Sequence, residues 1–330
     1  MSRARRILRT AGVAVAGFAV AQCASVGRKL TIAYGAVTAQ LAADEVKIEL
    51  DRSFIEAYKN RVTIQARFTV DASAGSPNPA IFDGDYHFAG RAPEIGLRLV
   101  AEILNGADAD SAVALVKRAE EAKQPLVMTG AWRLWPEHAL GTPQEQGRPV
   151  APLRNANPDH VFEINPITRL GPIDLRSTIH TVEGYRPGSA ERTFEIYQAA
   201  KCSLAVSPEK VTMTVSTGLY NDVHFLMRPT ADRHLVARDG RFVTADALDA
   251  GGKVLVERLR MVFIAGSGPE RAVRGLATGA RLHVWGKPRV DFAELSRRVQ
   301  ASAANPALLK GRLPYEIVVL GTYPDERKTQ

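Results

Sequence analysis

Three residues that could do chemistry lie two apart on one short stretch of the chain: Asp83, Asp85 and His87. At this spacing their side chains would project from one face of a β-strand. Carboxylates and imidazole on one face can ligate a divalent metal such as Zn²⁺ or Mn²⁺, or position a water for hydrolysis. The other members of this densest polar cluster are Glu102, His138, His160 and Glu163. The metal hypothesis uses Asp83, Asp85, His87, Glu102 and His138.

A structural interpretation competes with the metal hypothesis, and we favour it. A strand with one solvated face gathers polar side chains without any catalytic role. A cross-strand Asp–His hydrogen bond, or a turn bonded by Asp83, would also explain the pattern. A metal or ligand site is the second hypothesis, and a metal-dependent, nuclease-like hydrolase using Asp83, Asp85, His87 and Glu102 is the third.

Three short patterns occur twice in the same order. The segment 85–88 resembles 222–225, the segment 126–134 resembles 282–290, and the segment 161–164 resembles 314–317. Three matches in order predict two copies of one β-rich domain. The shared residues are an Asp-x-His pair (Asp85 and His87, Asp222 and His224), a G-x-x-R turn and a closing glutamate.

The G-x-x-R turn supplies candidate ligand-binding residues, Arg133 and Arg289. Each arginine could instead pair with the closing glutamate of its own copy, Glu163 or Glu316, which is a structural role. Trp132 and Trp135 could stack bases or sugars, or fill cores. The sequence has no G-x-S-x-G, H-E-x-x-H, phosphate-loop or C-x-x-C motif. We therefore expect a binding protein more than an enzyme.

The elements expected around these residues are mostly strands. Arg61–Val70 alternates apolar and polar residues, and Ala112–Ala122 has the apolar spacing of a helix. We take residues 47–58 as a polar lead-in and 141–158 as a long loop. The second copy is expected to begin near residues 211–215 and to contain a helix at 292–302.

Each copy then has about five strands and one helix. This predicts a mainly β protein of two tandem small Greek-key barrels of the oligonucleotide/oligosaccharide-binding kind, with a β-sandwich as the alternative. The expected domains are residues 47–170 and 191–325, joined by a linker at 171–190.

Segments of the first copy resemble a family of small, often secreted proteins with no established activity. Its members carry D-G-D-x-H, x-x-T-G and E-x-H-P-V strands, matched here by 83–87, 127–130 and 163–167. The resemblance covers roughly residues 60–170 and implies a fold similar to the oligonucleotide/oligosaccharide-binding barrel. The chain departs from the pattern at Asn165, where the family has histidine. If that histidine were a ligand or a base, its role would be lost here.

The N-terminus predicts export. Four arginines precede an apolar run and an A-x-A site ending at Ala21, which together are typical of a signal peptide at residues 1–21. The run is too short to span a bilayer, so we expect no transmembrane span. Cys23 follows a lipobox-like sequence, so it could carry a lipid or pair with Cys202.

Cleavage after Ala21 would remove four arginines and halve the net charge of +8, which weakens an argument for nucleic acid from charge. We expect a periplasmic or extracellular binding or scaffold protein, with an envelope saccharide or a nucleic acid as its polymer ligand. The alternatives are the nuclease-like hydrolase and a structural module that binds an envelope protein.

Overall fold

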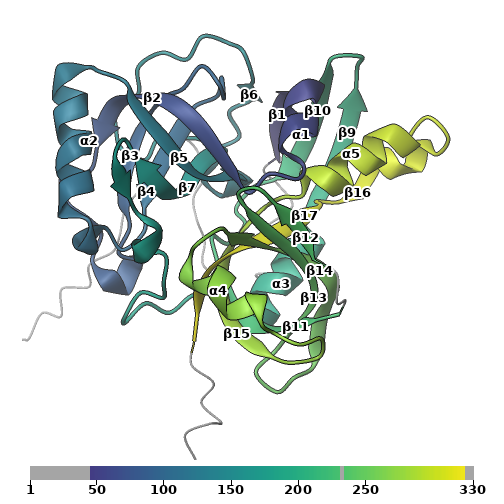
Figure 1. Cartoon of the computed structure of the whole chain (residues 1–330). Helices are drawn as coiled ribbons and strands as arrows, with labels where there is room; N and C mark the ends of the chain where they lie inside the picture. The colour runs from purple at the N-terminus through teal and green to yellow at the C-terminus, as the bar shows by residue number, and fades with distance from the viewer. Residues whose placement is uncertain (1–44, 231–233, 324–330) are drawn as a thin grey trace, which may run out of the picture. The chain divides into compact units, whose positions relative to one another are not determined.

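Two barrels and a third sheet contain the described residues, which are 45–230 and 234–323 of this computed structural model (Figure 1). The predicted signal peptide and Cys23 lie outside these residues.

The first barrel has five strands: β2 (Thr63–Ser73), β3 (Tyr86–Arg91), β4 (Leu99–Ile103), β5 (Leu126–Leu134) and β7 (Phe162–Leu170). They pair in the order β4-β3-β2-β5-β7, and a parallel pairing of β4 with β7 closes the barrel. α2 (Asp110–Ala122) connects the third and fourth strands and packs along β2 (Figure 1). A short β8 (Ile173–Asp174) extends β7. A closed five-stranded Greek key of this order is the oligonucleotide/oligosaccharide-binding topology.

The second barrel repeats this order with β11 (Val223–Pro229), β13 (Gly240–Leu248), β14 (Val254–Ile264), β15 (Leu282–Val290) and β17 (Tyr315–Thr322). β14 and β17 close it in parallel, and β12 (Leu235–Ala237) pairs with β13. The predicted fold class is thereby confirmed. The helix equivalent to α2 is the short α4 (Gly268–Arg274), whereas the expected helix, α5 (Phe292–Ala301), lies between the fourth and fifth strands.

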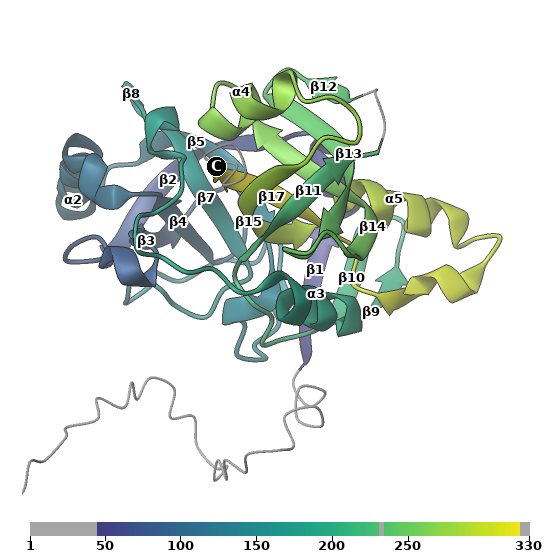
Figure 2. The same cartoon turned by 90° about the horizontal axis from the view of Figure 1, so that it is seen from below.

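A third sheet collects strands from distant parts of the chain. Its order is β16 (Lys310–Arg312), β9 (Lys201–Val206), β10 (Lys210–Ser216), β1 (Glu45–Asp51) and β6 (Gln144–Glu145). α1 (Arg52–Tyr58) follows β1, and α3 (Ala190–Ala199) precedes β9 and contacts β11 and β14 (Figure 2).

This sheet corrects two expectations. Residues 47–58 are not a lead-in, because Val46, Ile48 and Leu50 are buried on one face of β1. Residues 211–215 do not begin the second barrel, because β10 pairs antiparallel with β1 instead.

The strand registers show which repeated segments are equivalent. Arg133 lies opposite Glu163, and Arg289 lies opposite Glu316, so the second and third sequence matches are structural repeats. The first match is not. Asp85 precedes β3, the second strand of its barrel, whereas Asp222 precedes β11, the first strand of the other. The two Asp-x-His pairs are therefore a coincidence of sequence.

The two barrels contact each other reciprocally through the repeated arginines. Arg133 Nε donates to Pro288 O at 2.8 Å, and Arg289 Nη1 donates to Trp132 O at 3.0 Å. Each guanidinium thus reaches the carbonyl of the residue before the other arginine, as in a contact with approximate two-fold symmetry. A buried apolar cluster with residues of both barrels accompanies this contact, and it includes Ile179 and Val182 of the expected linker.

The expected G-x-x-R turns are wrong, because Gly130 and Arg133 lie within β5 and Gly286 and Arg289 lie within β15. Close packing against the fifth strand explains the glycine in each copy. A Cβ at Gly130 would lie 2.6 Å from Pro166 O, and one at Gly286 would lie 2.6 Å from Val318 O. We predict that Gly130→Ala and Gly286→Ala each lower the free energy of unfolding by about 1–3 kcal/mol. Gly275→Ala, where a Cβ meets nothing within 4 Å, is the control. Urea unfolding of the three variants measures this, and a Gly286→Ala variant as stable as the control would contradict it.

Candidate functional site

The polar cluster expected from sequence is assembled, but it is buried and has its own cation. Asp85 and Glu102 are almost fully buried. Lys287 of β15 reaches across from the second barrel, with Nζ 3.2 Å from Asp85 Oδ2 and 3.2 Å from Glu102 Oε2. The structure thus corrects the expectation of an open metal site at these residues, because a buried ammonium occupies the position between the two carboxylates.

The other two members of the Asp83–Asp85–His87 series have local partners. Asp83 Oδ1 accepts from Asn78 Nδ2 at 2.9 Å and from the amide of Asp85 at 3.1 Å, which is the turn-bonding role of the structural interpretation. His87 Nε2 lies 3.3 Å from Glu102 Oε1, on the neighbouring strand. Its side chain is 13% exposed, so it forms the solvent edge of the cluster.

Burial and charge set the protonation states. Burial opposes a charge on His87, but Glu102 outweighs it and raises the pKa of His87 to about 9. Burial also opposes the charge of Lys287, and Glu102 and Asp85 raise its pKa nonetheless. For Asp85, burial prevails over Lys287 and raises the pKa well above its ordinary value. The pKa of Glu102 falls, because Lys287 and His87 overcome its burial. Glu102 is therefore the carboxylate that carries the negative charge.

The cluster continues through Asn165 into the repeated Glu–Arg pair. Asn165 Nδ2 donates to Glu102 Oε2 at 2.5 Å and to Glu163 Oε2 at 3.1 Å. Arg133 Nη1 donates to both oxygens of Glu163 at 2.7 Å, and its Nη2 donates to Glu137 at 2.5 Å. In the second barrel Arg289 Nε donates to Glu316 at 2.7 Å. The expected Glu–Arg pair in each barrel is confirmed.

The two halves of this contact differ in chemistry at equivalent positions. The strand registers match four positions of one half with four of the other. On the second and third strands, His87 corresponds to Phe242 and Glu102 to Val262. On the fifth and fourth strands, Asn165 corresponds to Val318 and Lys287 to Ala131. The four apolar residues all belong to the buried cluster that accompanies the contact. The half of the contact around Lys287 is therefore ionic, and the equivalent half around Ala131 is apolar.

The proposed ligand-binding residues lie inside the molecule. Trp132 is fully buried, with Phe292 stacked at 4.4 Å between ring centroids and the Arg289 guanidinium 3.7 Å from the ring centroid. Trp135 is also buried and donates from Nε1 to Tyr220 O at 3.1 Å. Arg133 and Arg289 are both buried. This corrects the expectation that these four side chains meet a ligand, because none of them reaches the surface.

The exposed cations gather elsewhere, at a hollow of about 510 Å³ on the third sheet. Its lining includes Glu45, Lys201, Ser203, Thr214, Lys310 and Arg312. Lys201 lies directly opposite Arg312, Ser203 lies between Lys310 and Thr214, and Lys47 lies opposite Thr214 on the next strand. Residues directly opposite each other share one face of a sheet. Lys47, Lys201, Lys310, Arg312, Ser203 and Thr214 form what we call the basic face.

The basic face has an electrostatic cost. Like charges directly opposite each other on neighbouring strands are destabilising, and Lys201 opposite Arg312 is such a pair. No acidic side chain in the described ranges forms an ion pair with any of its four cations. Sequence analysis missed this surface because β16 was not expected to be a strand. The basic triplet Lys310-Gly-Arg312 was the available signal.

A second hollow, of about 610 Å³, lies at the long loop between β5 and β7. Two of its arginines have carboxylate partners: Arg148 Nε lies 2.5 Å from Glu145, and Arg98 Nη1 lies 3.4 Å from Asp159. These partners make it a weaker anion site than the basic face.

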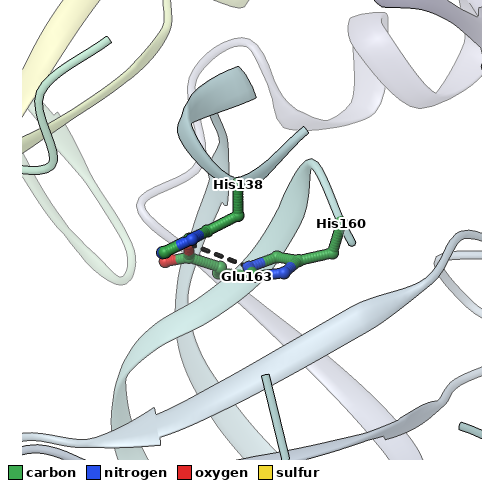
Figure 3. A group of neighbouring side chains, drawn as sticks. All are labelled: His138, His160 and Glu163. Carbon is green, nitrogen blue, oxygen red and sulfur yellow. Dashed lines mark hydrogen bonds and ion pairs between the residues drawn. The ribbon is translucent and has the colours of Figure 1, made fainter. Parts of the chain in front are cut away.

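One group within the described residues has the composition and spacing to hold a metal ion: His138, His160 and Glu163, whose candidate ligand atoms lie within 4.8 Å of one another (Figure 3). His138 was expected to bind metal with Asp83, Asp85, His87 and Glu102, whereas the structure groups it with His160 and Glu163. Glu163 also joins this group to the buried ionic cluster through Asn165, which donates to both Glu163 and Glu102.

Comparisons with known proteins show no family for the chain. No family model and no curated protein matches it. One similar solved structure is a deletion mutant of the single-stranded DNA binding protein from Thermus aquaticus. It is 10% identical, with a TM-score of 0.21, over 80% of this chain and 94% of that one. Within 45–230 and 234–323, no helix has the length and apolar character to cross a membrane.

A double-mutant cycle tests the buried ion pair. We predict that Lys287→Ala lowers the free energy of unfolding by about 3–5 kcal/mol, because it removes the buried cation shared by Glu102 and Asp85 and leaves Glu102 with His87 alone. Adding Glu102→Val gives this half the same residue types as the apolar half has at Ala131 and Val262. The double variant should recover part of the lost stability. Urea unfolding of both single variants and the double variant gives the coupling. A double variant no more stable than Lys287→Ala would contradict the equivalence.

The raised pKa of His87 predicts a pH dependence of stability. Protonated His87 stabilises the fold fully below pH 6.5, the ordinary value, and this contribution is lost as pH rises through about 9. The loss should be on the order of 3 kcal/mol between pH 6.5 and 9.5. His87→Gln, which cannot titrate, should flatten this decline. His180→Gln, at an exposed histidine, is the control, and an unchanged pH profile in His87→Gln would exclude this role.

Proposed function

We propose that the protein is a non-catalytic binding module for an anionic polymer, and that the basic face is where the polymer binds. The single observation that carries this proposal is a set of three cations, Lys201, Lys310 and Arg312, that line a 510 Å³ hollow and form no ion pair within the described residues. Lys47 adds a fourth cation on the same face of the sheet. Opposed like charges lower stability, and a bound polyanion would neutralise them.

The usual ligand surface of this fold is not free in either barrel. Barrels of this kind bind ligands on their second and third strands. Here outward residues of those strands meet the other barrel: Glu102 contacts Lys287, and Phe242 and Val262 lie in the shared apolar cluster. His87 pairs with Glu102 at the edge of this contact. A ligand must therefore use a surface outside the barrel–barrel contact, and the third sheet provides one.

The chemistry of the basic face favours an acidic polysaccharide over a single-stranded nucleic acid. Recognition of single strands relies on aromatic side chains that stack bases. The lining of the hollow has lysine, arginine and hydroxyl groups and one carboxylate, Glu45, but no aromatic side chain, and Trp132 and Trp135 are buried. Ammonium and hydroxyl groups suit the carboxylates and hydroxyls of a uronic acid polymer. The N-terminal sequence supports export, which would bring the protein to such polymers.

The test is a binding titration of the full chain with a labelled polyuronate, a single-stranded oligonucleotide of equal charge and neutral dextran. We expect polyuronate binding that weakens with salt, and no dextran binding. The double reversal Lys201→Glu/Arg312→Glu should reduce affinity about tenfold or more, or about 1.4 kcal/mol.

The matched control is Arg118→Glu/Lys123→Glu, which makes the same change in net charge on exposed positions of α2 and its C-terminal cap. It should leave affinity nearly unchanged. Equal losses of affinity in both double variants would show that binding depends on net charge alone and would overturn the proposed site. Preferential binding of the oligonucleotide would show that the basic face binds nucleic acid rather than polysaccharide. Absence of binding to both polyanions would refute the proposal.

A further inference from the structure

We propose that His138, His160 and Glu163 form a binding site for a transition-metal dication, with Zn²⁺ the best match. The site is independent of the basic face. It lies where the long loop leaves β5 and where it returns to β7, so an ion there would join the two ends of the loop (Figure 3).

The hydrogen bonding of His160 carries this inference. Nδ1 of His160 lies 2.7 Å from the carbonyl oxygen of Pro158. A carbonyl can only accept, so Nδ1 must hold the proton, and Nε2 of the neutral ring carries a lone pair. That lone pair lies 3.2 Å from Glu163 Oε1, another acceptor. Two acceptors in contact require a cation between them, either a proton or a metal ion.

The surroundings are those of a metal ligand. A ligating histidine commonly donates its other N–H to a backbone carbonyl, which fixes the tautomer and aims the free nitrogen at the ion. The Pro158 carbonyl does this for His160. Around a tetrahedral Zn²⁺ with ligands at 2.0–2.1 Å, neighbouring ligand atoms are about 3.4 Å apart. The 3.2 Å between His160 and Glu163 is close to that spacing.

His138 supplies the third ligand and the access route. Its ring stacks on His160 with centroids 5.0 Å apart, and its side chain is 38% exposed, whereas His160 and Glu163 are buried. Glu137 Oε1 lies 2.9 Å from His138 Nε2 and adds negative charge beside the site.

Arg133 competes for Glu163 but leaves room for an ion. It donates to both oxygens of Glu163, and Glu137 balances its charge. A carboxylate oxygen has two lone pairs, so Oε1 can accept from Arg133 and still face His160. Two imidazoles and one carboxylate favour Zn²⁺ over the harder Mg²⁺.

The experiment uses the full chain without an affinity tag, stripped of metal and dialysed against Zn²⁺ or Mg²⁺. We expect one Zn²⁺ per chain and no Mg²⁺, and a higher Tm with Zn²⁺. The Co²⁺ form should show visible bands without a thiolate charge-transfer band, which excludes Cys23 and Cys202 as ligands.

His138→Ala should lower Zn²⁺ affinity at least about tenfold and remove the Tm increase, since it deletes one ligand. The His138 side chain is 38% exposed, so this variant should fold, and circular dichroism checks that. His180→Ala removes another exposed histidine beside a carboxylate, Asp108, and should retain full binding. Absence of stoichiometric Zn²⁺ from the parent chain, or equal binding by His138→Ala, would show that the cation between His160 and Glu163 is a proton.

Discussion

The reciprocal reach of Arg133 and Arg289 is the interaction on which the rest of the structure depends. Each buried guanidinium ties the fourth strand of one barrel to a backbone carbonyl in the other, while pairing with its own closing glutamate. This contact sets the outer faces of the second and third strands against the opposite barrel. Polar groups on those faces are then cut off from water, and each needs a partner from across the boundary. Lys287 meets that need for Glu102.

The contact between the two barrels has approximate two-fold geometry, but its two halves differ in chemistry. Two apolar halves would stabilise the dimer-like arrangement at least as well, since hydrophobic replacements of buried ion pairs are often neutral or favourable. Stability alone therefore does not account for the ionic half, and we infer a role in specificity. Its effect is on specificity: Lys287 fits beside Glu102, but the equivalent position in the other half faces Val262 and Val318. A buried polar group of this kind distinguishes the two barrels, so each has one orientation against the other.

Much of the fold, and little of the site, could be predicted from the sequence. The repeated glycine, arginine and glutamate positions predicted the barrels and their Glu–Arg pairs, because those contacts are local to each copy. Lys287 could not be predicted, since its carboxylate partners belong to the other copy. The Asp-x-His match misled because β3 and β11 occupy different places in their barrels. The third sheet was missed although Val46, Ile48 and Leu50 alternate clearly, because its partners come from residues up to Arg312.

Packing of the two barrels against each other determines which of their surfaces stay exposed. When two copies pack through their second and third strands, the surface that serves single barrels becomes interior. Trp132, Arg133 and Arg289 suggest ligand binding in the sequence, but all three are buried in the folded protein. Under the proposed function, the binding surface then lies on the third sheet, outside the barrel strands. The third sheet takes β1, β9 and β10 from outside the barrels, and β6 and β16 from the connections between the fourth and fifth strands of the two barrels. Its outward face carries Lys201, Lys310 and Arg312 together with hydroxyl groups and Glu45.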